Sequence, residues 1–160
     1  MQKRSIPKNA AKQAKERDGG LLLPHSIAKI HGFGDANGKH GEAQTVAHVS
    51  LKYFCPTYQC LSKWTQDDLE ALSGFVGKVN QRTWVQIYET AGSLGNKKGL
   101  GYTPHKDRNI LPSSPAVASI SEDITFFELR VTERARVHGF RSGPAFFLCF
   151  LDKDHAICPM

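Results

Sequence analysis

Long apolar runs are missing from this chain of 160 residues. None approaches the roughly 18 residues that a membrane-spanning helix requires. The apolar stretch at 21–23, behind a basic start, is too short for a secretory signal, so we expect a cytoplasmic protein. A phosphate-binding loop of the GxxxxGK(S/T) type is also missing. The glycine-rich run GFGDANGKHG at 32–41 therefore predicts a plain loop.

Cysteine is scarce, with four in the whole chain. In a cytoplasmic protein these are expected to be reduced thiols, and Cys149, inside the apolar run FFLCFL, is expected to lie in the core. A zinc site is the alternative for the others. It would combine Cys55, Cys60, His155 and Cys158. The four-residue gap in CPTYQC and the lone cysteine after the histidine are poor zinc spacing, so we expect no metal and no cofactor.

Acidic residues are outnumbered, since 15 Asp and Glu face 21 Lys and Arg, which gives a formal charge of +6. This balance favours an anionic partner such as RNA, DNA or an acidic protein, although a basic protein can lack one. Residues 1–18 are rich in cations and show no apolar stripe. We predict that residues 1–44 form a basic, partly flexible N-terminal extension, either disordered or an arm for nucleic acid or a partner protein.

Residues 45–160 carry strand-like and helical patterns and predict a single α+β domain. The segment TVAHVSLKY at 45–53 alternates and predicts a strand. Thr65 and Asp68 have the spacing of a helix N-terminal capping box, and apolar residues follow at helical spacing. A second helix is expected over 82–90. The expected architecture is a helical hairpin packed on a small, mainly antiparallel twisted sheet.

Residues 91–121 form a long stretch without a clear pattern. Such a stretch in a small domain is often functional or mobile. It is basic and contains an aromatic residue, a combination that suits single-stranded RNA. The candidate RNA-binding residues in this stretch are Lys97, Lys98, Tyr102, Lys106 and Arg108. Arg134, further along the chain, is a sixth candidate.

The segment FFELRVTERARVHGF has the alternation of a two-faced hairpin. With a turn near residue 133, Glu128 would lie opposite His138, a favourable cross-strand pair. Arg130 would lie opposite Arg136, and such like-charge pairs destabilise a sheet by a few tenths of a kcal/mol or more. We therefore expect that acids screen the two guanidinium groups or that an anion binds between them.

The run AFFLCFL at 145–151 predicts a central strand that is buried on both faces. The charged segment DKDH follows and would place His155 at the rim of the sheet near the arginines. Because Asp152 and Asp154 flank it, His155 is either a proton-transfer group or a solvated terminal residue.

This order of features resembles the RelE/ParE toxin superfamily, and within it the mRNA interferases of the RelE and YoeB type. Those proteins carry an arginine, an acidic turn, a second arginine six residues on, an apolar strand and a histidine near the terminus. The matching positions are Arg130, Glu133, Arg136, 146–151 and His155. GLGYTP at 99–104 matches their Gly/Pro loop, and the resemblance covers roughly residues 46–158.

The resemblance implies a RelE-like fold and the toxin of a toxin–antitoxin system, with a cognate antitoxin as partner. The implied activity is metal-independent cleavage of mRNA, in association with the ribosome. It implies catalytic roles for Arg136 and His155, with Arg130 beside them. His105 stands where the family has a glutamate base, and histidine can take either proton role. The terminal tyrosine of the family is replaced by Ala156.

Two other functions stay open. A ParE-like toxin would act on DNA gyrase without nuclease chemistry, but such toxins lack the proton-transfer groups that His105 and His155 would supply. A non-enzymatic RNA- or protein-binding module would bind in a salt-sensitive manner without cleavage.

Overall fold

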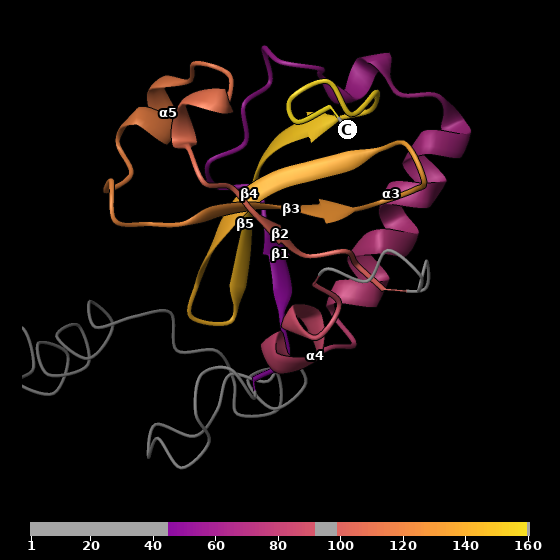
Figure 1. The fold of residues 1–160 in the computed structure, drawn as a ribbon. Coiled ribbons are helices and arrows are strands. Elements are labelled where there is room, and N and C mark those ends of the chain that lie inside the picture. Colours follow the sequence, from indigo (N-terminus) through magenta and orange to yellow (C-terminus); the bar gives the residue numbers. More distant parts are fainter. Residues whose placement is uncertain (1–44, 92–98, 160) are drawn as a thin grey trace, which may run out of the picture.

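The computed structural model describes residues 45–91 and 99–159 (Figure 1). The predicted N-terminal extension, Lys97 and Lys98 lie outside these residues. The described part is an α+β fold built on a five-stranded open sheet, ordered β1-β5-β4-β3-β2. The strands are β1 (His48–Ser50), β2 (Thr103–Pro104), β3 (Phe126–Arg130), β4 (Arg136–Ser142) and β5 (Ala145–Asp152). The sheet is mixed, because β1 runs parallel to β5 while the other neighbouring pairs are antiparallel.

Two capping boxes start the helices that follow β1. Thr65 caps α3 (Gln66–Val79) together with Asp68, as the sequence predicts. Thr83 caps α4 (Trp84–Tyr88) through a box with Gln86, so this helix is shorter than the predicted 82–90. In each box a side chain accepts a hydrogen bond from a backbone N–H that the first helical turn leaves unpaired.

Two predicted segments differ from the structure. The first strand is shorter than 45–53, since β1 covers only His48–Ser50 before the chain turns. The described part of 91–121 is less irregular than expected. It contains β2, which pairs with β3, a short helix α5 (Pro115–Ala118), and a 3₁₀ turn at Arg108–Ile110. A second 3₁₀ turn, Leu61–Lys63, precedes α3.

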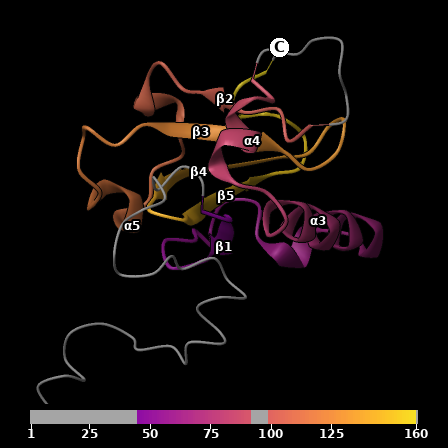
Figure 2. The same ribbon diagram turned by 90° about the horizontal axis from the view of Figure 1, so that it is seen from below.

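The two helices α3 and α4 bury their apolar side chains against one face of the sheet. This cluster includes Phe75, Val79, Trp84 and Ile87 from the helices, with Phe127, Leu129, Val137, Phe146, Leu148 and Leu151 from the strands. Helix α5 contributes Val117 to a second cluster, separate from the one that α3 covers, and Figures 1 and 2 show the two helices well apart. The aromatic residues Phe75 of α3 and Trp84 of α4 are core residues, because both are buried in the first cluster.

The second face of the sheet is apolar at one end and polar at the other. The apolar end contains Cys55, Val117, Phe126, Phe140, Cys149 and Phe150. Cys149 is fully buried, as predicted for a residue of a central strand, and all four cysteines are free thiols. The polar end carries the candidate site.

A β-bulge in β5 determines which side chains reach that polar end. The register shifts between His138 and Gly139, and two consecutive residues of β5, Cys149 and Phe150, both pack in the second cluster. Since side chains otherwise alternate along a strand, the bulge inverts the facing of the last residues of β5. Asp152 therefore lies opposite Arg136 on the polar face and not among the helices.

Candidate active site

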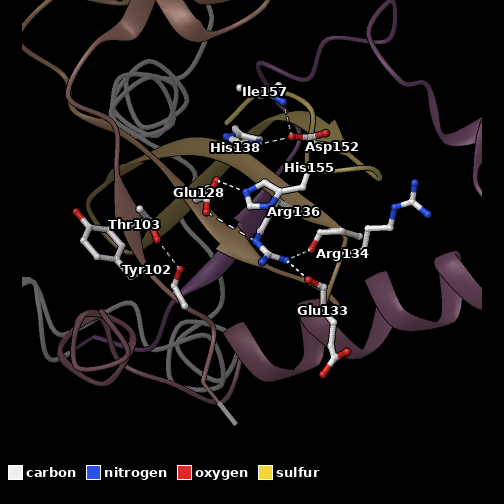
Figure 3. A network of polar contacts seen from close by, with 12 residues as sticks. Tyr102, Thr103, Glu128, Glu133, Arg134, Arg136, His138, Asp152, His155 and Ile157 are labelled. Atoms are coloured by element: carbon white, nitrogen blue, oxygen red, sulfur yellow. Dashed lines mark hydrogen bonds and ion pairs between the residues drawn. The ribbon is translucent and has the colours of Figure 1, made fainter. Parts of the chain in front are cut away.

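A row of ionisable side chains crosses β3, β4 and β5 on the second face of the sheet (Figure 3). Glu128, Arg136, His138 and Asp152 are all buried, with exposed fractions of 6%, 5%, 0% and 0%. Such residues are rarely buried unless they are paired. Two further histidines, His105 after β2 and His155 after β5, complete two connected sets of contacts.

The first set is a chain of hydrogen bonds through His138. Its Nε2 lies 3.2 Å from Asp152 Oδ2, and its Nδ1 lies 2.9 Å from Nε2 of His105. The two imidazole planes are nearly parallel, with an angle of 17° and ring centroids 5.1 Å apart, so the rings meet edge to edge through this hydrogen bond. The Asp152 carboxylate also accepts the backbone N–H groups of Ala156 and Ile157, at 2.8 and 2.9 Å. One carboxylate thus orients the buried histidine and holds the segment that follows β5.

The second set is centred on Glu128. One carboxylate oxygen lies 3.7 Å from Arg136 Nε, and the other lies 3.5 Å from His155 Nε2. His155 adopts a left-handed backbone conformation with a φ of 54°, which is uncommon for a residue with a side chain. Arg136 also donates from Nη1 to the carbonyl groups of Thr132 and Glu133, at 2.9 and 3.2 Å. The arginine therefore holds the β3–β4 turn as well as the glutamate.

The predicted opposition of Arg130 and Arg136 is confirmed by the register of β3 and β4. Burial lowers the pKa of Arg136 and the Arg130 charge lowers it further, while Glu128 acts in the opposite direction. Arg130 is half-buried and lies against Gly101, where a Cβ would be 3.3 Å from the guanidinium. Its Nε makes no hydrogen bond within the described residues. The Nε of Arg130 is therefore a buried donor beside a second cation, Arg136. A bound anion would need such a pair of groups.

His138 has a different partner from the one expected. The register does pair it with Glu128, as predicted. Its side chain bonds instead to Asp152 and His105, while the glutamate contacts Arg136 and His155. Sequence reasoning treated Asp152 only as an acid beside His155, because the bulge that brings it to this face leaves no local pattern.

The predicted RNA-binding residues are spread over several environments. The Tyr102 ring packs against the rings of Tyr88 and Phe127, with centroids 4.9 and 4.8 Å away, so it belongs to the core. Arg108 donates to backbone carbonyl groups and lies over the Phe126 ring. Both therefore have packing roles.

The exposed cations of that set are Lys106 and Arg134. Arg134 is 74% exposed and contacts Asp154 at 2.8 Å, close to the segment that carries His155. Arg134 is therefore an accessible cation at the rim of the polar face. Lys97 and Lys98 lie outside the described residues.

Metal ligands do not gather in the described residues. No group of three or more His, Cys, Asp or Glu side chains lies there in an arrangement that could hold a metal ion. The cysteines at 55, 60 and 158 therefore form no such site with His155. Among the same residues, no helix is long and apolar enough to cross a membrane.

Acid should destabilise the protein through His105. Burial, with the nearby His138, lowers the pKa of His105 from 6.5 to about 4. The unfolded chain therefore binds this proton more readily, and stability present above pH 6.5 is lost as the pH falls toward 4. At about 1.4 kcal/mol per pKa unit, the loss from this group is at most about 3 kcal/mol. Urea unfolding at pH 7.5 and pH 4.5 would measure it.

The matched control is His105→Asn, which has no titrating group at this position. The variant should lose less stability than the wild type between these two pH values. Equal losses in both proteins would show that His105 does not carry the effect.

Comparison with known proteins identifies no family, since no family model, no curated protein and no solved structure matches the chain. The chemistry of the two connected sets of side chains is therefore the main guide to function. They contain three histidines, two carboxylates and Arg136, and Arg130 lies opposite Arg136 in the sheet. These are groups that can move protons and stabilise negative charge on a phosphate.

Proposed function

We propose that this protein is a metal-independent endoribonuclease that cleaves mRNA, in association with the ribosome, as the toxin of a toxin–antitoxin pair. The observation that carries the proposal is the polar end of the sheet. There Glu128 joins Arg136 to His155, and Arg130 lies opposite Arg136 with a buried donor that has no hydrogen-bond partner in the part of the chain that the structure describes. An α+β fold with a helical hairpin on one face supports the resemblance to RelE-like toxins.

The reaction would be an attack of the 2′-hydroxyl on the adjacent phosphate, which releases the 5′-oxygen. His105 takes the 2′-hydroxyl proton, and protonated His155 supplies a proton to the leaving oxygen. Arg130 and Arg136 stabilise the charge on the pentacoordinate phosphorus, since the planar guanidinium presents several donors to phosphate oxygens. The protein itself supplies the base, the acid and the cations. The product carries a 2′,3′-cyclic phosphate.

Loss of His155 should stop cleavage without unfolding the protein. His155→Ala removes one proton-transfer step, which is worth about 10²–10⁴-fold in rate. The measurement is the rate at which end-labelled RNA, free or on translating ribosomes, yields 2′,3′-cyclic phosphate ends. Arg130→Ala should also be slow, because it removes the half-buried cation.

Lys78→Ala is the matched control, since it removes an exposed cation from α3, which packs against the opposite face of the sheet. This variant should cleave like the wild type. The proposal fails if the wild type leaves RNA intact in both settings, or if His155→Ala cleaves at the wild-type rate. RNA binding without cleavage would favour a binding module, and gyrase-dependent DNA breaks would favour a ParE-like toxin.

A further inference from the structure

The contacts of His138 determine which nitrogen atoms carry protons along the first set. The Asp152 carboxylate can only accept, so Nε2 of His138 is the donor in that contact. In a neutral imidazole the other nitrogen then has a free electron pair, and Nδ1 of His138 accepts from Nε2–H of His105. The remaining nitrogen of His105, Nδ1, is consequently left as a proton acceptor.

This arrangement is more than a packing contact between two rings. His138 and Asp152 are fully buried, whereas His105 is half-buried at the end of the chain of hydrogen bonds. Burial raises the pKa of Asp152, but hydrogen bonds from His138 and from two backbone N–H groups outweigh it and lower the pKa overall. A carboxylate that stays ionised is therefore held against the inner imidazole.

We propose that His105, His138 and Asp152 form a proton relay in which His105 is the general base, an inference that rests on the proposed endoribonuclease function. The 2′-hydroxyl proton binds to Nδ1 of His105 as the oxygen attacks phosphorus. The proton on Nε2 of His105 passes to Nδ1 of His138. The bond from phosphorus to the 5′-oxygen breaks, and that oxygen takes a proton from His155. One positive charge has then moved onto His138, beside the Asp152 carboxylate.

The relay explains how His105 can act as a base although its pKa is low. Burial lowers its pKa to about 4, and a base this weak gains little by holding the proton itself. Transfer inward places the charge where a carboxylate compensates it. The other groups near the pair are Glu128 on β3, which also favours a charge on His138, and Arg136 on β4, which opposes it. The Tyr58 hydroxyl lies on the Asp152 side, where burial and that carboxylate raise its pKa.

Nitrogen-15 NMR of wild-type protein with labelled histidine tests the relay without any substitution. Above pH 8 both imidazoles should be neutral and protonated at Nε2. When the pair takes up a proton, His105 should stay neutral but carry its proton on Nδ1, because its Nε2 proton passes to His138. The relay is overturned if His105 carries its proton on Nδ1 above pH 8, or if an added proton stays on His105 and leaves His138 neutral. This measurement decides the relay even if the protein cleaves no RNA, a result that would remove only the proposed function.

A kinetic test uses His138→Gln, because glutamine still offers an acceptor to His105 but cannot carry the proton. The expected result is a loss of about 10²-fold in kcat with KM unchanged, together with a changed pH profile. Circular dichroism would verify that the variant is folded. Wild-type kcat and an unaltered pH profile in the folded variant would overturn the relay while leaving the nuclease activity intact.

Discussion

Replacing Gly139 by alanine is expected to destabilise the protein by at least about 3 kcal/mol, at the upper end of the cost of overpacking a core. A Cβ at this position would overlap the Phe147 carbonyl oxygen and lie 2.9 Å from Cε2 of Phe146. The first contact is with the backbone of β5, which cannot move aside without breaking the ladder. The effect would appear as a lower urea midpoint or as insoluble protein.

The matched control is Gly77→Ala in α3, where a Cβ would have no neighbour within 4 Å. Because alanine in a helix is favoured over glycine by about 0.5–1 kcal/mol, this variant should be more stable than the wild type. A Gly139→Ala protein that unfolds at the wild-type midpoint would show that β4 and β5 are not so closely apposed at the bulge.

Gly139→Ala should also disturb the bulge, and this would change the surroundings of His138. The bulge is what turns Asp152 toward His138. A folded Gly139→Ala protein should therefore show a changed His138 resonance even where the helices remain intact. This links a stability effect in the sheet to the geometry of the candidate site.

The sequence predicted the parts of this fold that depend on neighbours in the chain. Thr65 and Asp68 are three residues apart, so their capping box is visible directly. The register of β3 and β4 follows from a short turn and strict alternation, and it correctly placed Arg130 opposite Arg136. In both cases the contacts that determine the structure join residues no more than fourteen positions apart.

The remaining features depend on contacts between distant segments. Alternation along β5 would put Asp152 on the helix side, and only the bulge against β4 reverses this. Tyr102 looked like a surface ring in a basic loop, but the pairing of β2 with β3 brings it against Tyr88 and Phe127. His105 reaches His138 through the same pairing, since its backbone N–H donates to the Phe126 carbonyl group. Composition and spacing carry no signal for such contacts.

Removal of either partner of the Glu128–Arg136 pair is expected to cost about 3–5 kcal/mol, because it leaves a buried charge uncompensated. Their side chains are only 8% and 6% exposed. The double variant Glu128→Gln with Arg136→Met should be less destabilised than the sum of the two single variants. A double-mutant cycle from urea unfolding measures this coupling.

The exposed pair Arg134–Asp154 is the matched control. Its side chains are 74% and 51% exposed, and its coupling should stay below about 1 kcal/mol because water screens it. Equal coupling energies in the two cycles would contradict the expectation that burial strengthens the interaction between Glu128 and Arg136. If the difference is as large as expected, inactivity of an Arg136→Ala protein cannot be assigned to chemistry, since unfolding would produce it as well. Arg130, half-buried and without a hydrogen bond at Nε within the described residues, is therefore the arginine whose replacement tests phosphate stabilisation most directly.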